Sequence, residues 1–141
     1  MTLVNLYTIA ECDNIDVYSY DLKECESLSV MVDGTCAVAV NPFALKSESD
    51  EKVKLAHELG HCETGAFYNC FSALDIRSKH EYTANKWAIK KLVPEDELKQ
   101  AIKNGCENRW QLSEYFGVTE DFMQKALDYY RERGILYEIC Y

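Results

Sequence analysis

Residues 55–61 read Leu-Ala-His-Glu-Leu-Gly-His, and this heptapeptide is the most informative part of the 141-residue chain. Two histidines four residues apart on a helix lie on one face, so His57 and His61 can both reach one ion. Glu58 lies one position round the helix, where it can hold a water without binding the ion. This H-E-x-x-H pattern predicts a catalytic zinc site with two imidazole ligands and Glu58 as the general base.

A catalytic zinc ion needs a third protein ligand and an open fourth position. Glu81 is the best candidate, because the segment after His61 is long enough for a loop and a second helix that returns beside the first. His80 is the rival ligand. It points about 100° away from Glu81 on the same helix, so only one of the two can face the metal. Asn85, one turn beyond Glu81, is expected to accept the outer N–H of a ligating histidine or to hold Glu81 in place.

Length and composition favour a single globular unit. Hydrophobic residues make up 48% of the chain and charged residues 28%, which excludes intrinsic disorder. No stretch reaches the roughly 18 apolar residues of a membrane helix. The N-terminus lacks the basic and apolar regions of a signal peptide. We therefore expect a cytoplasmic protein with no membrane partner.

The charge balance bears on which partners are possible. Fifteen basic residues stand against 24 acidic ones, a net charge of -9. No segment offers the basic stripe on which phosphate binding depends, so no direct nucleic-acid partner is expected. A metal ion or a basic protein is electrostatically easier to accommodate.

The seven cysteines are interpreted as free thiols. Their number is odd and no secretory signal precedes them, so a disulfide framework is not supported. Only Cys62 and Cys70 approach metal-ligand spacing, and Cys62 is expected to be a buried thiol rather than a ligand.

Periodicity predicts a helix and about three strands in the first third of the chain. Residues 3–12 place apolar side chains at helical spacing until Asn14 interrupts them. Residues 15–20 alternate with period two. Residues 28–32 and 36–40 flank a short turn that contains Gly34, which predicts a hairpin.

The remainder is predicted to be helical. A first helix should be capped by Ser49 and end at Gly65. A second should run over residues 78–92, with its apolar side drawn from Tyr82, Trp87, Ile89 and Leu92. A third should begin at Pro94 and end at Gly105.

Residues 107–133 have the rhythm of a helix-turn-helix, with a break at Gly117 and a cap at Thr119. Six apolar residues are expected to be buried at this corner: Leu112, Phe116, Val118, Phe122, Ala126 and Leu127. The second helix opens with Glu120 and Asp121, which would repel phosphates. A structural or substrate-docking role is therefore favoured over a DNA-binding one.

Three blocks resemble the ImmA/IrrE family of metallo-endopeptidases, specifically its short Gram-positive and phage-type members. They are residues 55–69, residues 80–94 (His-Glu-Tyr-Thr-Ala-Asn-Lys-Trp-Ala-Ile-Lys-Lys-Leu-Val-Pro) and residues 112–122 (Leu-Ser-Glu-Tyr-Phe-Gly-Val-Thr-Glu-Asp-Phe). The resemblance spans about residues 15–133.

The resemblance implies an α+β, minimal zincin fold of the gluzincin type that carries one Zn²⁺ per chain. His57, His61 and Glu81 would be the ligands, with Glu58 as base. Residues 1–103 would form the zinc metallopeptidase domain, and residues 104–141 a helical extension packed on it as one compact unit. Relatives are implicated in cleaving a helix-turn-helix repressor, which derepresses a mobile element or a stress regulon.

Several points stay open in the sequence. No histidine stands within a few residues after the zinc helix, where several relatives have one, so the transition-state stabiliser is unassigned among Tyr68, His80 and Tyr82. The strand that ends near Val40 is a candidate for pairing with an extended substrate. The alternative function is a non-catalytic module that binds a repressor and keeps a structural or vestigial zinc site.

Overall fold

The computed structural model describes residues 1–68 and 71–135, and within them the architecture is α+β, as predicted. Six helices and one three-stranded sheet are consistent with a minimal zincin-like fold. The elements follow the order α1 (Leu3–Cys12), β1 (Asp16–Ser19), β2 (Ser27–Val32), β3 (Thr35–Val40), α2 (Glu48–Thr64), α3 (Leu74–Leu92), α4 (Glu95–Lys103), α5 (Arg109–Phe116) and α6 (Glu120–Glu132).

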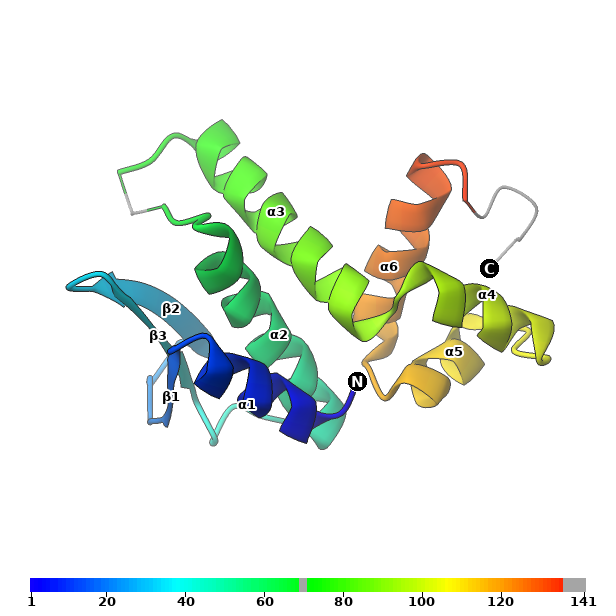
Figure 1. Ribbon diagram of the computed structural model, residues 1–141, viewed down its shortest axis with the longest axis horizontal. Coiled ribbons are helices and arrows are strands. Elements are labelled where there is room, and N and C mark those ends of the chain that lie inside the picture. The colour runs from blue at the N-terminus through cyan, green and yellow to red at the C-terminus, as the bar shows by residue number, and fades with distance from the viewer. Residues whose placement is uncertain (69–70, 136–141) are drawn as a thin grey trace.

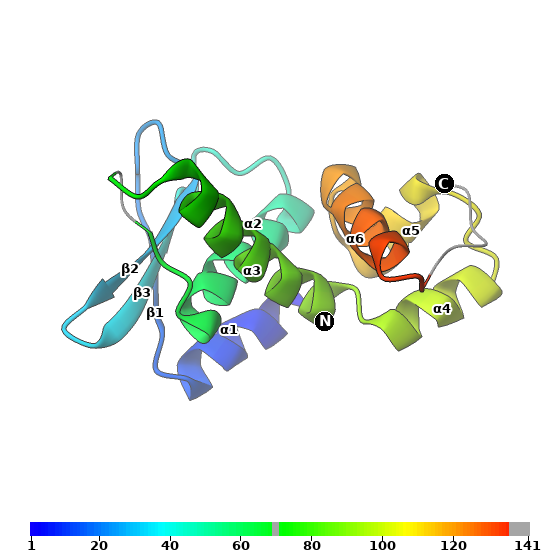
Figure 2. The same ribbon diagram turned by 90° about the horizontal axis from the view of Figure 1, so that it is seen from above.

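Helices α2 and α3 form the centre of the molecule (Figures 1 and 2). They run antiparallel and make the most extensive helix–helix contact in the described part of the chain. The sheet and α1 lie at one end of this pair, and α4, α5 and α6 lie at the other. The site therefore has a sheet on one side and a helical group on the other.

The sheet has the order β1-β3-β2, with β1 parallel and β2 antiparallel to β3. The hairpin that the sequence predicts is present, and its turn has two residues, Asp33 and Gly34, whose φ angles are positive at 50° and 80°. The hypothesis that the strand ending at Val40 pairs with substrate is wrong. Val40 already pairs with Ser19 on one side and Ser27 on the other, so β3 has no free edge.

The helix ends agree with the predicted stop signals better than with the predicted starts. Gly65 ends α2 in the left-handed region at φ 67°, as predicted. The cap of α2 is Ser47 rather than Ser49, because the Ser47 hydroxyl accepts a hydrogen bond from the amide of Asp50. Helix α3 begins at Leu74, before the predicted residue 78, without a side-chain cap that could be found in the sequence.

One apolar cluster runs through both ends of the molecule. It joins Val38 of the sheet and Leu55 of α2 to Leu112 of α5 and Leu127 of α6, all fully buried. The six apolar residues predicted for the C-terminal corner belong to it. Tyr82, in contrast, was expected on the buried side of α3 and is 48% exposed. Helix α3 buries small alanines instead, because it packs very closely on α2.

Lys52 ties α2 to the C-terminal helices. Its side chain is buried, and Nζ donates a 2.6 Å hydrogen bond to the carbonyl oxygen of Phe116, the last residue of α5. Burial lowers the pKa of Lys52, while nearby Glu48 opposes that shift. A buried amine satisfied by a helix-terminal carbonyl fixes the orientation of α5 against the start of α2.

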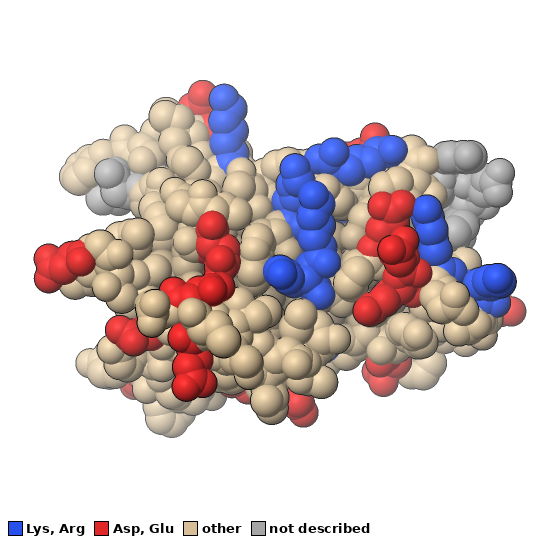
Figure 3. All heavy atoms as spheres, viewed as in Figure 1, with Lys and Arg blue, Asp and Glu red and all other residues tan. Residues whose placement is uncertain are grey.

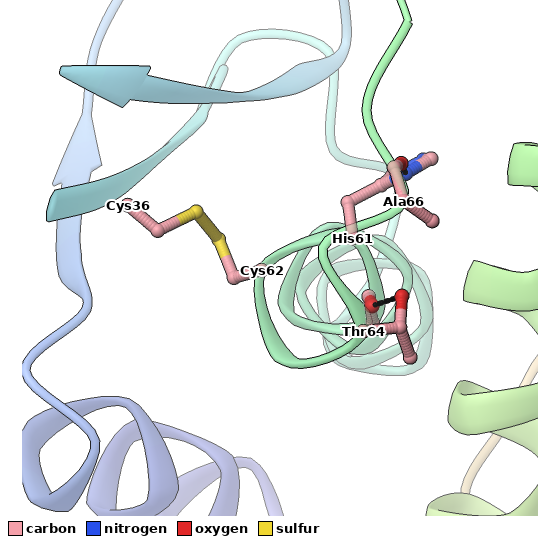
Figure 4. The surroundings of a disulfide bond; sticks show 6 residues. Cys36, His61, Cys62, Thr64 and Ala66 are labelled. Atoms are coloured by element: carbon pink, nitrogen blue, oxygen red, sulfur yellow. Dashed lines mark hydrogen bonds between the residues drawn. A yellow bond between two sulfur atoms is a disulfide. The ribbon is translucent and has the colours of Figure 1, made fainter. Parts of the chain in front are cut away.

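The prediction that all seven cysteines are free, mostly buried thiols is wrong. Cys36 of β3 and Cys62 of α2 form a disulfide, with Cα atoms 5.8 Å apart (Figure 4). Their 26-residue separation gave no indication of the pairing, which depends on how the sheet packs against the helix. Cys12 and Cys25 are exposed rather than buried. Cys70 and Cys140 lie outside the described residues.

We expect the Cys36→Ser variant to be less stable than the wild type by roughly 2–4 kcal/mol, because the cross-link restricts the unfolded chain. Urea unfolding with and without a thiol reductant would measure this difference. Cys12→Ser is the control, since Cys12 is an exposed free thiol. Equal wild-type stability in oxidising and reducing buffer would contradict the prediction.

Glu63 of α2 and Asp13, which caps α1, are neighbouring carboxyl groups. Burial, the hydrogen bond to Asp13 and the Asp13 charge raise the pKa of Glu63 from 4.5 to about 7, against the opposing effect of Lys91. Glu63 therefore binds its proton more tightly in the folded state than in the unfolded state. The pair stabilises the fold below about pH 4.5, and this contribution is lost as the pH rises through 7.

We expect Glu63→Gln to make the metal-free protein more stable than the wild type at pH 8, by up to about 1 kcal/mol because the side chain is exposed and screened. The difference should vanish near pH 4. Urea unfolding midpoints measured from pH 4 to pH 8 would test this, and a constant difference across that range would contradict it.

Charge is unevenly spread over the face seen in Figure 3. Lys and Arg side chains gather in a band over α3, while Asp and Glu side chains lie on either side of it. The last turn of α3 contributes Lys90 and Lys91 to the basic side chains of this helix. Within the described residues, no helix combines the length and apolar character that a membrane span requires.

Candidate metal centre

Two antiparallel helices bring three potential ligands together. His57 and His61 lie one turn apart on α2, and Glu81 faces them from α3. The Nε2 atoms of the two histidines are 3.2 Å apart. Glu81 Oε2 lies 2.9 Å from His57 Nε2, and Glu81 Oε1 lies 3.2 Å from His61 Nε2. Of the two candidates for the third ligand on α3, Glu81 faces the histidine pair and His80 does not.

The outer nitrogen of each histidine has its own partner. His57 Nδ1 lies 2.8 Å from Asn85 Oδ1, and His61 Nδ1 contacts the carbonyl oxygen of Ala66 just after α2 ends. Both partners are acceptors, so each Nδ1 carries the proton and each Nε2 presents a lone pair to the centre. The position of Asn85 fits the first of the two roles predicted for it.

The donor set fits a divalent transition metal. Two imidazole Nε2 atoms and a carboxylate converge to within 4.8 Å of one another, so two lone pairs and one anionic oxygen are directed at a common centre. Two neutral nitrogens and one anionic oxygen are typical ligands of Zn²⁺, whereas Mg²⁺ and Ca²⁺ prefer oxygen alone. Among the residues that the structure describes, three protein ligands converge, which leaves room for a further ligand on the open side.

Glu81 is held as a carboxylate. Burial raises its pKa, but the opposing interactions, led by the hydrogen bond from Tyr68, outweigh burial and keep the pKa below its ordinary value. The Tyr68 hydroxyl donates to Glu81 Oε1 at 2.7 Å. That hydrogen bond, with burial and the carboxylate charge, raises the pKa of Tyr68 to about 12. Tyr68 therefore remains a neutral donor at the edge of the centre.

Glu58 lies beside the three potential ligands and is not one of them. It is 6% exposed, and its Oε1 accepts a 3.1 Å hydrogen bond from the Ser27 hydroxyl at the start of β2. This contact crosses from the sheet to the helix, between residues 31 positions apart. Sequence reasoning missed Ser27, because nothing in a local pattern indicates a contact over that distance.

The two helices can approach this closely because residue 60 has no side chain. A Cβ built on Gly60 would lie 2.5 Å from the carbonyl oxygen of Ala84. Gly60 directly precedes His61, and Ala84 lies between Glu81 and Asn85. The separation between the histidines and Glu81 therefore depends on this backbone contact.

The centre opens into a cleft with two arms, both of which include Cys25, Ser27, Glu58 and Glu81. The larger arm, of 640 Å³, leads along α2 and is closed on one side by the start of α6. Its lining there consists of Thr119, Asp121, Phe122 and Lys125. The smaller arm, of 290 Å³, follows β2 and is lined by apolar and aromatic groups that include Leu28, Phe67 and Tyr68.

The three candidate stabilisers occupy different places. Tyr68 contacts the ligand cluster by its hydrogen bond to Glu81. His80 stacks behind the Tyr68 ring, with centroids 6.5 Å apart and planes at 11°. The Tyr82 hydroxyl accepts a hydrogen bond from Arg133, beyond the end of α6, so it serves a contact away from the ligands. Cys62 is turned from the site, because the disulfide and His61 project from different sides of α2 (Figure 4).

Comparison with known proteins agrees with this geometry. Residues 38–128 match the Peptidase_M78 family model, described as the IrrE N-terminal-like domain. No significant match is found among curated proteins or solved structures. The matched range includes the second half of β3, both helices of the centre and nearly all of the C-terminal helices. The chain therefore belongs to the IrrE N-terminal-like family of metallopeptidases, the ImmA/IrrE family.

Proposed function

We propose that the protein is a zinc-dependent endopeptidase that acts on a helix-turn-helix repressor. The observation that supports this most directly is the convergence of two Nε2 lone pairs and the Glu81 carboxylate beside a buried glutamate that is not a ligand. A purely structural metal site would not need Glu58 at its edge. In this proposal His57, His61 and Glu81 hold one Zn²⁺, and Asn85 orients His57.

Bound zinc would supply Lewis acidity, polarising the scissile carbonyl and acidifying a water. Glu58 takes the proton from the attacking water and delivers it to the leaving amine. The Tyr68 hydroxyl lies at the edge of the ligand set, and its single proton can turn from Glu81 to the oxygen on which negative charge develops. We therefore favour Tyr68 over His80 and Tyr82 as the stabiliser.

The substrate strand would pair with β2 rather than β3. Strand β2 is the edge strand on the side of the cleft, and its first residue, Ser27, contacts Glu58. An exposed edge leaves backbone donors and acceptors free for an extended segment. Residues 27–29 line the smaller arm, so a paired segment would pass directly in front of the ligands.

The C-terminal helices contribute to recognition in this proposal. Residues 1–103 form the zinc-binding unit, and residues 104–141 form an extension whose helix α6 closes the larger arm of the cleft. A net charge of -9 favours a basic partner such as a DNA-binding protein. A cytoplasmic location is consistent with such a substrate.

We expect Glu81→Ala to lose stoichiometric zinc, because two imidazoles alone leave the site without its anionic ligand. The control is His80→Ala, which removes a neighbouring residue of α3 outside the ligand cluster and should retain one zinc per chain. Metal content after dialysis would be measured by elemental analysis. Full zinc occupancy in Glu81→Ala would contradict the ligand assignment.

The activity itself is tested by incubating the zinc-loaded protein with purified helix-turn-helix repressors, starting with any that is encoded beside its gene. Appearance of two repressor fragments, blocked by a chelator, would support the proposal. Stable complex formation without cleavage would instead support the non-catalytic repressor-binding alternative. Failure both to bind and to cleave would contradict the repressor as substrate.

A further inference from the structure

The carboxylate of the proposed base has one hydrogen-bond partner in the described part of the chain. Ser27 Oγ donates to Glu58 Oε1 at 3.1 Å, and no second donor to this carboxylate is found within residues 1–68 and 71–135. Glu58 is 6% exposed, so few waters can replace this contact. One carboxylate oxygen is thus fixed by the protein, and the other is left for the cleft.

Ser27 and Ser29 are the two polar residues that β2 places on the face of the sheet bonded to α2 through Cys36. Ser27 lies opposite Val40 in the antiparallel pair, and side chains of directly opposite residues point to the same face. On that face β3 presents the buried residues Cys36, Val38 and Val40. An apolar side chain at residue 27 would continue this packing. The hydroxyl instead meets the carboxylate of Glu58.

The backbone around Ser27 is held from two directions. Just after β3, the buried residue Asn41 holds this segment with two hydrogen bonds. Its backbone N–H donates to Glu26 O at 2.9 Å, and its side-chain amide donates to Cys25 O at 3.1 Å. From α2, Lys54 forms a 3.2 Å ion pair with Glu26. Lys54 and Glu58 lie one helical turn apart, so the segment meets α2 at two successive turns.

We propose that Ser27 is a positioning residue that holds the Glu58 carboxylate in one orientation for proton transfer. The inference rests on the proposed function, because it takes Glu58 as the base. A general base must keep its oxygen within hydrogen-bond reach of the water that it deprotonates. Ser27 occupies Oε1 and thereby limits rotation of the carboxylate, so that Oε2 faces the position of that water.

The first test is structural and needs no activity. Crystal structures of the full-length Ser27→Ala and Ser27→Thr variants, purified without added metal, would be compared with the wild type. We expect the Glu58 side chain to adopt a second conformation in Ser27→Ala and to keep its wild-type position in Ser27→Thr. An unchanged Glu58 in Ser27→Ala would overturn the inference.

The second test is kinetic and uses a defined probe, a mixture of proteome-derived peptides whose cleavage products are quantified by mass spectrometry. For the peptide that the zinc-loaded wild type cuts fastest, Ser27→Ala should lower kcat by about tenfold, the size of one hydrogen bond to a charged group. KM and zinc content should not change. Ser27→Thr should recover most of the lost kcat.

Lys54→Met is the matched control for loosening of the segment. It removes the ion pairs of Lys54 to Glu26 and to Asp50 and leaves the hydroxyl of Ser27 in place. We expect its kcat to fall by less than about threefold, as for a partly exposed ion pair. Equal losses of kcat in Lys54→Met and Ser27→Ala would assign the effect to loosening and overturn the inference.

The failure of the inference can be told from the failure of the proposed function. In a Glu58→Gln background, Ser27→Ala should cause no further loss of kcat, because the two residues act as a unit. Full activity of Glu58→Gln would contradict the proposed function. An inactive Glu58→Gln variant together with a fully active Ser27→Ala variant would contradict only the role of Ser27.

Discussion

Glu58→Gln is expected to lower the rate of peptide cleavage by about 10²–10⁴-fold, while the protein continues to bind one zinc ion. Glutamine has nearly the same shape as glutamate and can still accept the hydrogen bond from Ser27, but it cannot take up a proton. The three potential ligands are untouched, because Glu58 is not among the atoms that converge on the centre. Activity and metal content should therefore separate in this variant.

The measurement pairs a cleavage assay with elemental analysis of the same preparation. Glu63→Gln is the matched control, because it makes the same chemical change five residues further along α2, outside the ligand cluster. It should retain both zinc and activity. A Glu58→Gln protein that cuts its substrate at the wild-type rate would show that Glu58 is not the base.

Gly60→Ala is expected to destabilise the metal-free protein by roughly 1–3 kcal/mol and to weaken zinc binding by at least about tenfold. The added Cβ would lie 2.5 Å from the carbonyl oxygen of Ala84, so α2 and α3 must separate. Separation moves Glu81 away from His57 and His61. Helix propensity alone predicts the opposite sign, because alanine is more favourable than glycine in a helix by about 1 kcal/mol.

Urea unfolding would measure the stability of Gly60→Ala, and a competition titration with a zinc-binding dye would measure its affinity. Adding Ala84→Gly to Gly60→Ala should give no rescue, because the close atoms belong to the backbone of Ala84 and not to its side chain. Increased stability, as propensity alone predicts, would contradict the close helix contact.

Local signals predict the elements well, because their physical causes are local. The Asp33–Gly34 turn, the left-handed Gly65 and Gly117 and the Thr119 cap all lie where the sequence places them. The start of α3 could not be predicted, because Ala73 precedes it without a capping hydrogen bond. The identity of the central strand could not be predicted either, since it depends on how β1 returns to pair with β3.

In the candidate site too, local spacing predicts some contacts, while others depend on tertiary packing. Helical spacing places His57 and His61 on one face, and the spacing to α3 brings Glu81 opposite them. The Ser27–Glu58 contact and the Cys36–Cys62 bridge join residues 31 and 26 positions apart. Both depend on the packing of the sheet on α2. No periodicity or cap in the sequence carries that information.

Because α6 forms one wall of the larger arm, the substrate preference of family members can change independently of their metal ligands. Asp121, Phe122 and Lys125 meet the cleft from a helix that none of the potential ligands shares. Substituting these residues would change the charge and polarity of the cleft wall without changing the two helices that carry the potential ligands. Under the proposed function, we expect a chimera that carries the α5–α6 segment of another relative to acquire that relative's choice of target while it keeps its own metal ligands.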